Sequence, residues 1–192
     1  MTEALARNIL EELKQRDFKI ESGLSNREVM TIQDTFDIVF PPDLMLLHQQ
    51  GLIVNDMFPN WRKALNSGDT YQKIRESLDW PLKGMLFDVE HNSFWQNQWG
   101  SKTESLKANL DIARKYFKNY PKLIPIFAHR YIPSSPKEMD NPVFSVMQMD
   151  IIYVGMNLPD YFSCEFGLEL NPALFENVKK RKREIPFWSL WP

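Results

Sequence analysis

Five polar residues beside two predicted strands are the side chains of this sequence best suited to chemistry: Asp88, Glu90, His91, His129 and Arg130. Asp88 and Glu90 share one face if the apolar segment around them is a strand, because side chains alternate along a strand. Such a carboxylate pair binds a metal ion or divides the acid and base roles of a hydrolysis. His129 would then be a third ligand or the base. The alternative interpretation is that the carboxylates pair with Arg130 or cap a turn.

The common signatures of enzymes are absent from the sequence. It contains no GxxxxGK[ST] phosphate loop, no GxGxxG turn, no HExxH zinc helix and no GxSxG nucleophile elbow. The single cysteine, Cys164, excludes an intrachain disulfide and a multi-cysteine metal site. We expect Cys164 to be buried in a core face. We also expect no cofactor, no metal ion and no catalytic activity.

Aromatic residues form a second group of candidate binding residues. Exposed Trp and Tyr side chains anchor protein interfaces because they bury a large area at a low entropic cost. The alternative is that these rings cover the hydrophobic core. Six of them fall in predicted connections: Phe58, Trp61, Trp80, Phe94, Trp95 and Trp99.

Charge is unevenly distributed along the chain. The formal net charge of -2 conceals a basic run at residues 179–183, whereas residues 1–178 carry 18 basic and 24 acidic residues, a net charge of -6. An acidic body repels the phosphates of nucleic acids and attracts a basic protein partner. The basic run is either a binding segment for RNA, an acidic partner or anionic lipid, or the solvated end of a helix.

Length and composition favour one folded domain with appendages. A chain of 192 residues, 43% hydrophobic and 25% charged, is long and apolar enough to bury a core. The longest stretch without Asp, Glu, Lys or Arg covers residues 44–55, which is shorter than the ~20 residues that span a bilayer. The first residues lack the charged and then apolar pattern of a signal segment, so we expect none. We therefore expect a cytoplasmic protein without a membrane partner.

Apolar residues at helical spacing predict helices in the first part of the chain, over residues 3–16, 25–36, a short segment after position 43, and 61–78. Ser25 and Glu28 are spaced as a capping box at the start of the second helix. Asp43 is expected to cap the third helix and Gly51 to end it in the left-handed conformation. Pro81 is expected to prevent continuation of the fourth.

Strands and helices are mixed in the second part. The pattern predicts strands over residues 84–89, 123–131 and 143–154, and helices over residues 101–117, 158–166 and 172–183. Ser101 with Glu104 is expected to cap the inserted helix. Helices first and strands later is the order typical of an α+β fold. The apolar tail, residues 185–192, is expected to dock on the domain or on a second copy, which would give a homo-oligomer.

Several short motifs lie between residues 23 and 167. They include Gly23-Leu24-Ser25 with Glu28, Phe40-Pro41-Pro42-Asp43-Leu44, Phe58-Pro59-Asn60-Trp61-Arg62, Leu86-Phe87-Asp88-Val89-Glu90-His91-Asn92 and His129-Arg130-Tyr131-Ile132-Pro133. Together they resemble the SMI/KNR family of the SUKH superfamily. We therefore divide the chain into an N-terminal helix with its connector (1–22), an SMI/KNR-like domain (23–167) and a basic, aromatic C-terminal segment (168–192).

The resemblance implies a single α+β domain in which helices pack on a mainly antiparallel sheet. It also implies a role without catalysis, since bacterial relatives are immunity proteins that neutralise toxins by binding them, and eukaryotic relatives are interaction scaffolds. We predict a protein-binding domain, an immunity protein whose partner is a basic toxin domain. Its predicted contacts are Trp61, Arg62, Asp88, Glu90, Trp95, His129 and Arg130. The alternatives are a regulatory scaffold that uses the basic tail, and a metal-dependent hydrolase built on Asp88, Glu90 and His129.

Overall fold

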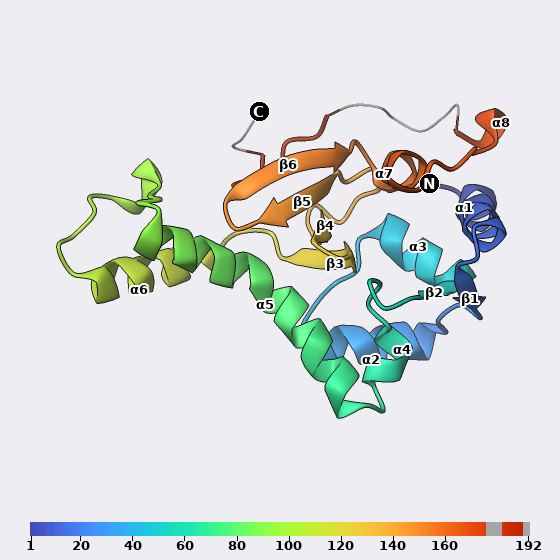
Figure 1. Cartoon of the computed structure of the whole chain (residues 1–192), viewed down its shortest axis with the longest axis horizontal. Coiled ribbons are helices and arrows are strands. Elements are labelled where there is room, and N and C mark those ends of the chain that lie inside the picture. Colours follow the sequence, from blue (N-terminus) through green and yellow to red (C-terminus); the bar gives the residue numbers. More distant parts are fainter. Residues whose placement is uncertain (176–181, 190–192) are drawn as a thin grey trace.

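The computed structural model of this chain describes residues 1–175 and 182–189, and it confirms an α+β fold in which helices pack on antiparallel sheets (Figure 1). Within these ranges the elements are α1 (Glu3–Gln15), β1 (Lys19–Glu21), α2 (Asn26–Phe36), α3 (Pro42–Gln50), β2 (Leu52–Val54), α4 (Trp61–Ala64), α5 (Gly68–His91), the 3-10 turn η1 (Asn97–Trp99), α6 (Leu106–Phe117), β3 (Leu123–Phe127), β4 (Arg130–Pro133), β5 (Val143–Met147), β6 (Asp150–Gly155), α7 (Leu158–Phe166) and α8 (Pro172–Phe175).

The main sheet is an antiparallel meander in the order β3-β4-β5-β6. The sequence predicted one strand where β3 and β4 form a hairpin, and one strand where β5 and β6 form another. These predictions were wrong because each hairpin turns without a glycine or proline. Ala128 and Gln148 adopt positive φ angles of 47° and 57° instead, a conformation that non-glycine residues enter at a cost.

Two hydrophobic cores lie on opposite faces of this sheet. In β3, Leu123 belongs to one core and Ile124 to the other, and Tyr131 and Ile132 of β4 are divided in the same way. Successive side chains of a strand point to opposite faces, so the sheet separates the cores. One core contains the N-terminal helices and α7, and the other contains α6, the end of α5 and residues 185–188.

Helix α5 runs from α4 at one end to α6 at the other (Figure 1), and it contributes side chains to both cores. Ile74, near its start, packs in the first core, and Met85 and Val89, near its end, pack in the second. The predicted strand over residues 84–89 is therefore wrong, and Pro81 lies inside the helix. Burial of the apolar face outweighs the helix propensity of one proline, since tertiary packing routinely overrides propensity.

Local capping signals explain several helix boundaries. Thr2 caps α1, the reciprocal capping box of Ser25 and Glu28 starts α2, and Gly167 ends α7 in the left-handed conformation. Ser105 caps α6, so the capping box predicted at Ser101 is wrong.

Helix α3 departs from the prediction at both ends. Pro41 stands at its N-cap position, and the buried Asp43 carboxylate instead accepts the backbone N–H of Asp140 at 2.6 Å. Gly51 follows the helix with φ at -178°, so it is extended and not left-handed. A Cβ atom there would lie 2.8 Å from Cδ1 of Leu10, and this close approach explains the glycine. The strands β1 and β2 pair beside it and were not predicted.

The described part of the C-terminal tail docks on the domain, which is one of the two alternatives that we expected for it. Ile185, Phe187 and Trp188 are buried in the second core, and the Trp188 indole donates to the carbonyl of Pro121 at 2.7 Å. Of the helix predicted over residues 172–183, Pro172–Phe175 is helical as α8, residues 182 and 183 are not helical, and residues 176–181 lie outside the described ranges. Cys164 is exposed, contrary to prediction. Among the described residues, no helix combines the length and the apolar character needed to cross a bilayer.

Candidate functional site

Asp88 and Glu90 do not form the predicted carboxylate pair. They lie in a helix, where residues two apart point about 200° from each other. Asp88 is buried, and its Oδ2 accepts the backbone N–H of Met149 at 2.8 Å, while Asn92 donates to its other oxygen at 2.5 Å. Glu90 is exposed. Asp88 therefore fixes the β5–β6 turn against α5.

His129 lies in the turn between β3 and β4, beside Arg130. The Arg130 guanidinium pairs with Glu165 at 3.1 Å, donates to Oγ of Ser145 at 2.9 Å and contacts Nε2 of His129. Burial, aided by the positive charge of Arg130, lowers the pKa of His129, so its imidazole is neutral at pH 7. The parts of the chain that the structure describes bring together no group of three His, Cys, Asp or Glu residues able to hold a metal ion.

Arg62 is engaged in a network that joins α4 to the start of α2. Its Nε donates to Glu28 at 2.6 Å, and its other nitrogens donate to the carbonyls of Ser22 and Gly23 at 2.9 and 2.8 Å. The hydrogen bond from Arg62, followed by that from the backbone of Ser25, lowers the pKa of Glu28 to about 2. The arrangement holds together two of the motifs that carry the family resemblance.

We expect Arg62→Gln to lower the free energy of unfolding at pH 7 by about 1–2 kcal/mol, because charge-assisted hydrogen bonds are lost at a partly exposed site that water screens. The pKa of Glu28 is lowered on folding, so this contribution is present above pH 4.5 and is lost as the pH falls toward 2. Urea unfolding at pH 7 and at pH 3 measures both effects. The exposed Arg27 provides the control, and an equal loss in Arg27→Gln would contradict the network.

The aromatic residues divide between core and surface. Trp61, Trp99 and Phe58 are 0%, 4% and 7% exposed and belong to the cores. Trp95 is half-buried, and its indole donates to the carbonyl of Gly100 at 2.7 Å. Trp80 is 41% exposed. Of the predicted contacts, Trp61 and Asp88 thus lie in the interior, where no partner reaches them in this conformation.

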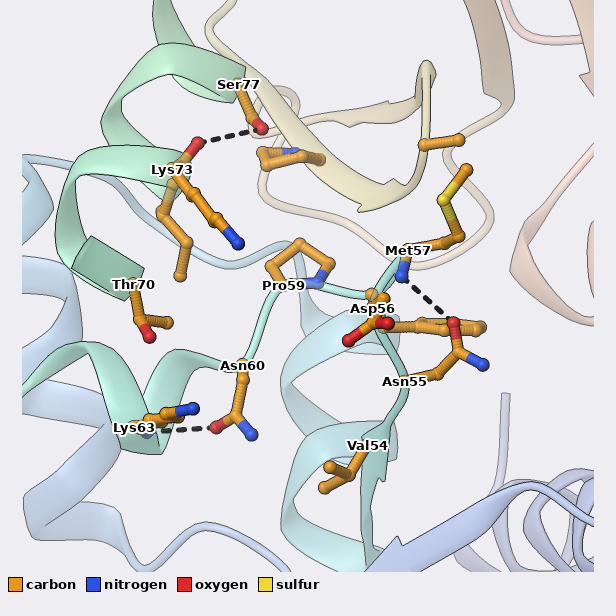
Figure 2. Close-up of a pocket in the computed structure, with 14 residues that line it drawn as sticks. Val54, Asn55, Asp56, Met57, Pro59, Asn60, Lys63, Thr70, Lys73 and Ser77 are labelled. Atoms are coloured by element: carbon orange, nitrogen blue, oxygen red, sulfur yellow. Dashed lines mark hydrogen bonds between the residues drawn. The ribbon is translucent and has the colours of Figure 1, made fainter. Parts of the chain in front are cut away.

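A groove runs between α5 and the segment of residues 54–60, and the β3–β4 turn closes its side. It consists of two adjoining hollows of about 310 and 560 Å³. Both are lined by Asp56, Met57, Lys73, Ser77 and Ala128. Figure 2 shows the narrower hollow, with Thr70, Lys73 and Ser77 of α5 on one side and the 54–60 segment on the other. We call the whole depression the α5 groove.

Three apolar side chains remain exposed at the wider hollow of the α5 groove. Met57, Trp80 and Met147 are 52%, 41% and 47% exposed, and all three line it. The Trp80 indole donates to the carbonyl of Val146 at 3.2 Å, which orients the ring. His129 is the one predicted contact residue that lines the groove. The sequence singled out Trp80 only as one aromatic among six, and nothing in the sequence marked the two methionines.

Comparisons with protein-family models, curated proteins and solved structures found no match to this chain. A function for this chain is therefore inferred from the geometry of the α5 groove and from the resemblance in sequence.

Proposed function

We propose that this chain is a non-enzymatic protein-binding domain of the cytoplasm, an immunity protein that neutralises a toxin by covering part of its surface. The observation that carries the proposal is the α5 groove with its exposed side chains Met57, Trp80 and Met147. Apolar side chains gathered at a depression are typical of surfaces that bind other proteins.

Two further observations support the proposal. The hydrolase alternative requires Asp88 and Glu90 to act together with His129, but Asp88 is buried and accepts the backbone N–H of Met149, whereas Glu90 is exposed to solvent. The net charge of -6 over residues 1–178 favours the approach of a basic partner. Toxins that act on nucleic acids are expected to have basic surfaces, because they bind phosphates. The resemblance to the SMI/KNR family agrees with this role.

Growth rescue and titration test the proposal together. We expect the full chain to restore growth of cells that express the toxin encoded beside it. In vitro, toxin activity should fall in proportion to the amount of added protein and reach zero at about one chain per toxin molecule, because each toxin molecule binds one chain. Inhibition by a small fraction of an equivalent would contradict the proposal, because it would indicate catalysis. Absence of any protein partner would contradict it as well.

A further inference from the structure

The α5 groove differs in charge between its two ends. Asp56 and Glu76 line the wider hollow with Lys73 as the one cation. Neither carboxylate forms a salt bridge with a residue that the structure describes, and Glu76 accepts only the amide of Gln72 at 3.0 Å. Lys63 lines only the narrower hollow. The wider hollow is therefore acidic, with two carboxylates against one ammonium group. His129 adds no positive charge at pH 7, because burial lowers the pKa of its ring.

Apolar side chains surround this acidic end. Methionine side chains are unbranched and adapt to irregular partners, and Met57 and Met147 stand at the wider hollow with the fixed ring of Trp80. An indole face attracts a guanidinium or ammonium group. Glu76 lies four residues before Trp80 on the same side of α5, so a cation over the ring also lies near a carboxylate.

We infer that the α5 groove receives a segment of the partner protein in which arginine or lysine alternates with apolar residues. The basic side chain enters the wider hollow over the Trp80 ring, near Asp56 and Glu76, and the apolar side chains cover Met57 and Met147. The two hollows share five lining residues and form one continuous depression, which suits an extended chain. This inference rests on the proposed function and names its binding site.

Fluorescence anisotropy with labelled ten-residue peptides tests the inference on the full chain. We expect a peptide of alternating leucine and arginine to bind at least about tenfold more tightly than one with glutamate for arginine or serine for leucine. Trp80→Ala should weaken binding by about tenfold. Phe87→Ala, which removes an exposed aromatic of α5 outside the groove, should leave binding unchanged.

A matched pair of charge variants distinguishes binding in the groove from general electrostatic attraction to the acidic chain. D56K/E76K is expected to weaken binding by at least about tenfold, whereas D34K/E104K, with the same change in net charge at exposed sites outside the groove, should weaken it by less than about threefold. Circular dichroism checks that each variant is folded. Equal losses in the two pairs would overturn the inference.

Other occupants of the groove are also distinguishable. Tighter binding of the glutamate peptide, or a dimer in sedimentation that Trp80→Ala abolishes, would overturn the inference in favour of an acidic segment or a second copy. If the natural toxin binds D56K/E76K and Trp80→Ala as tightly as the unchanged chain, the groove is the wrong site while the proposed function stands. If the peptides behave as expected and no toxin is neutralised, the proposed function fails and the groove remains.

Discussion

Replacement of Gly23 by alanine is expected to lower the free energy of unfolding by about 3 kcal/mol or more, beyond the usual cost of overpacking. A Cβ atom at Gly23 would lie 1.9 Å from the carbonyl oxygen of Gln49 and 2.4 Å from its carbonyl carbon. These are backbone atoms at the end of α3, so no side-chain rotation relieves the clash. Either α3 or the segment before α2 has to move.

Hydrogen bonds on both sides of Gly23 oppose such a movement. The backbone N–H of Leu24 donates to the carbonyl of His48 at 2.8 Å, and the carbonyl of Gly23 accepts from Arg62 at 2.8 Å. Urea unfolding of Gly23→Ala measures the loss. Gly68→Ala is the control, because nothing lies within 4 Å of a Cβ at that position, at the start of α5. A Gly23→Ala protein as stable as the control would show that the contact is not tight.

The sequence predicted the elements whose signals are local. The capping box of Ser25 and Glu28 depends on residues within one helical turn, and the structure contains it; the helix predicted over residues 158–166 is likewise present as α7. Helix α5 was divided wrongly because Pro81 is a strong local signal for a helix end, whereas the packing that holds the helix together comes from the sheet.

The α5 groove could not be predicted for a related reason. Met57, Trp80 and Met147 are far apart in the sequence. The hairpin of β5 and β6 brings Met147 to Trp80 of α5, and the backbone N–H of Ala128 in the β3–β4 turn donates to the carbonyl of Met57 at 2.9 Å, which holds Met57 at the same hollow. Gly84 permits this approach, since a Cβ there would lie 2.7 Å from Cα of Gln148. Exposure of a methionine has no signature in the sequence, because Met149, two residues after the exposed Met147, is buried.

The stability of the protein is expected to fall by about 3 kcal/mol between pH 7 and pH 4 because of His48 alone. His48 lies on α3, is 9% exposed and packs edge-on against Phe40, with ring centroids 5.3 Å apart. Neither ring nitrogen has a hydrogen-bond partner among the described residues. Burial therefore lowers the pKa of His48 from 6.5 to about 4.

The sign of the effect follows from proton uptake. Between pH 6.5 and about 4 the unfolded chain carries a proton on His48 that the folded chain lacks, so the contribution is fully present above pH 6.5 and declines as the pH falls to about 4. Below that range the folded state is protonated as well and the decline ends. Asp43, on the same helix, acts in the opposite direction above pH 3.8, because burial raises the pKa of its carboxyl group and the folded chain keeps a proton that the unfolded chain loses.

His48→Leu isolates the contribution of the imidazole, since the variant keeps Asp43 and Glu28 and loses only one titrating group. We expect the difference in unfolding free energy between pH 7 and pH 4.5 to shrink by about 2 kcal/mol in His48→Leu, whatever its stability at pH 7. The exposed His91 provides the matched control, and His91→Leu should retain the full pH dependence. Urea titrations at the two pH values measure all three proteins. A pH dependence unchanged in His48→Leu would mean that water or a movement of α3 solvates the imidazolium in the folded state, and that the core around α3 opens more readily than its burial indicates.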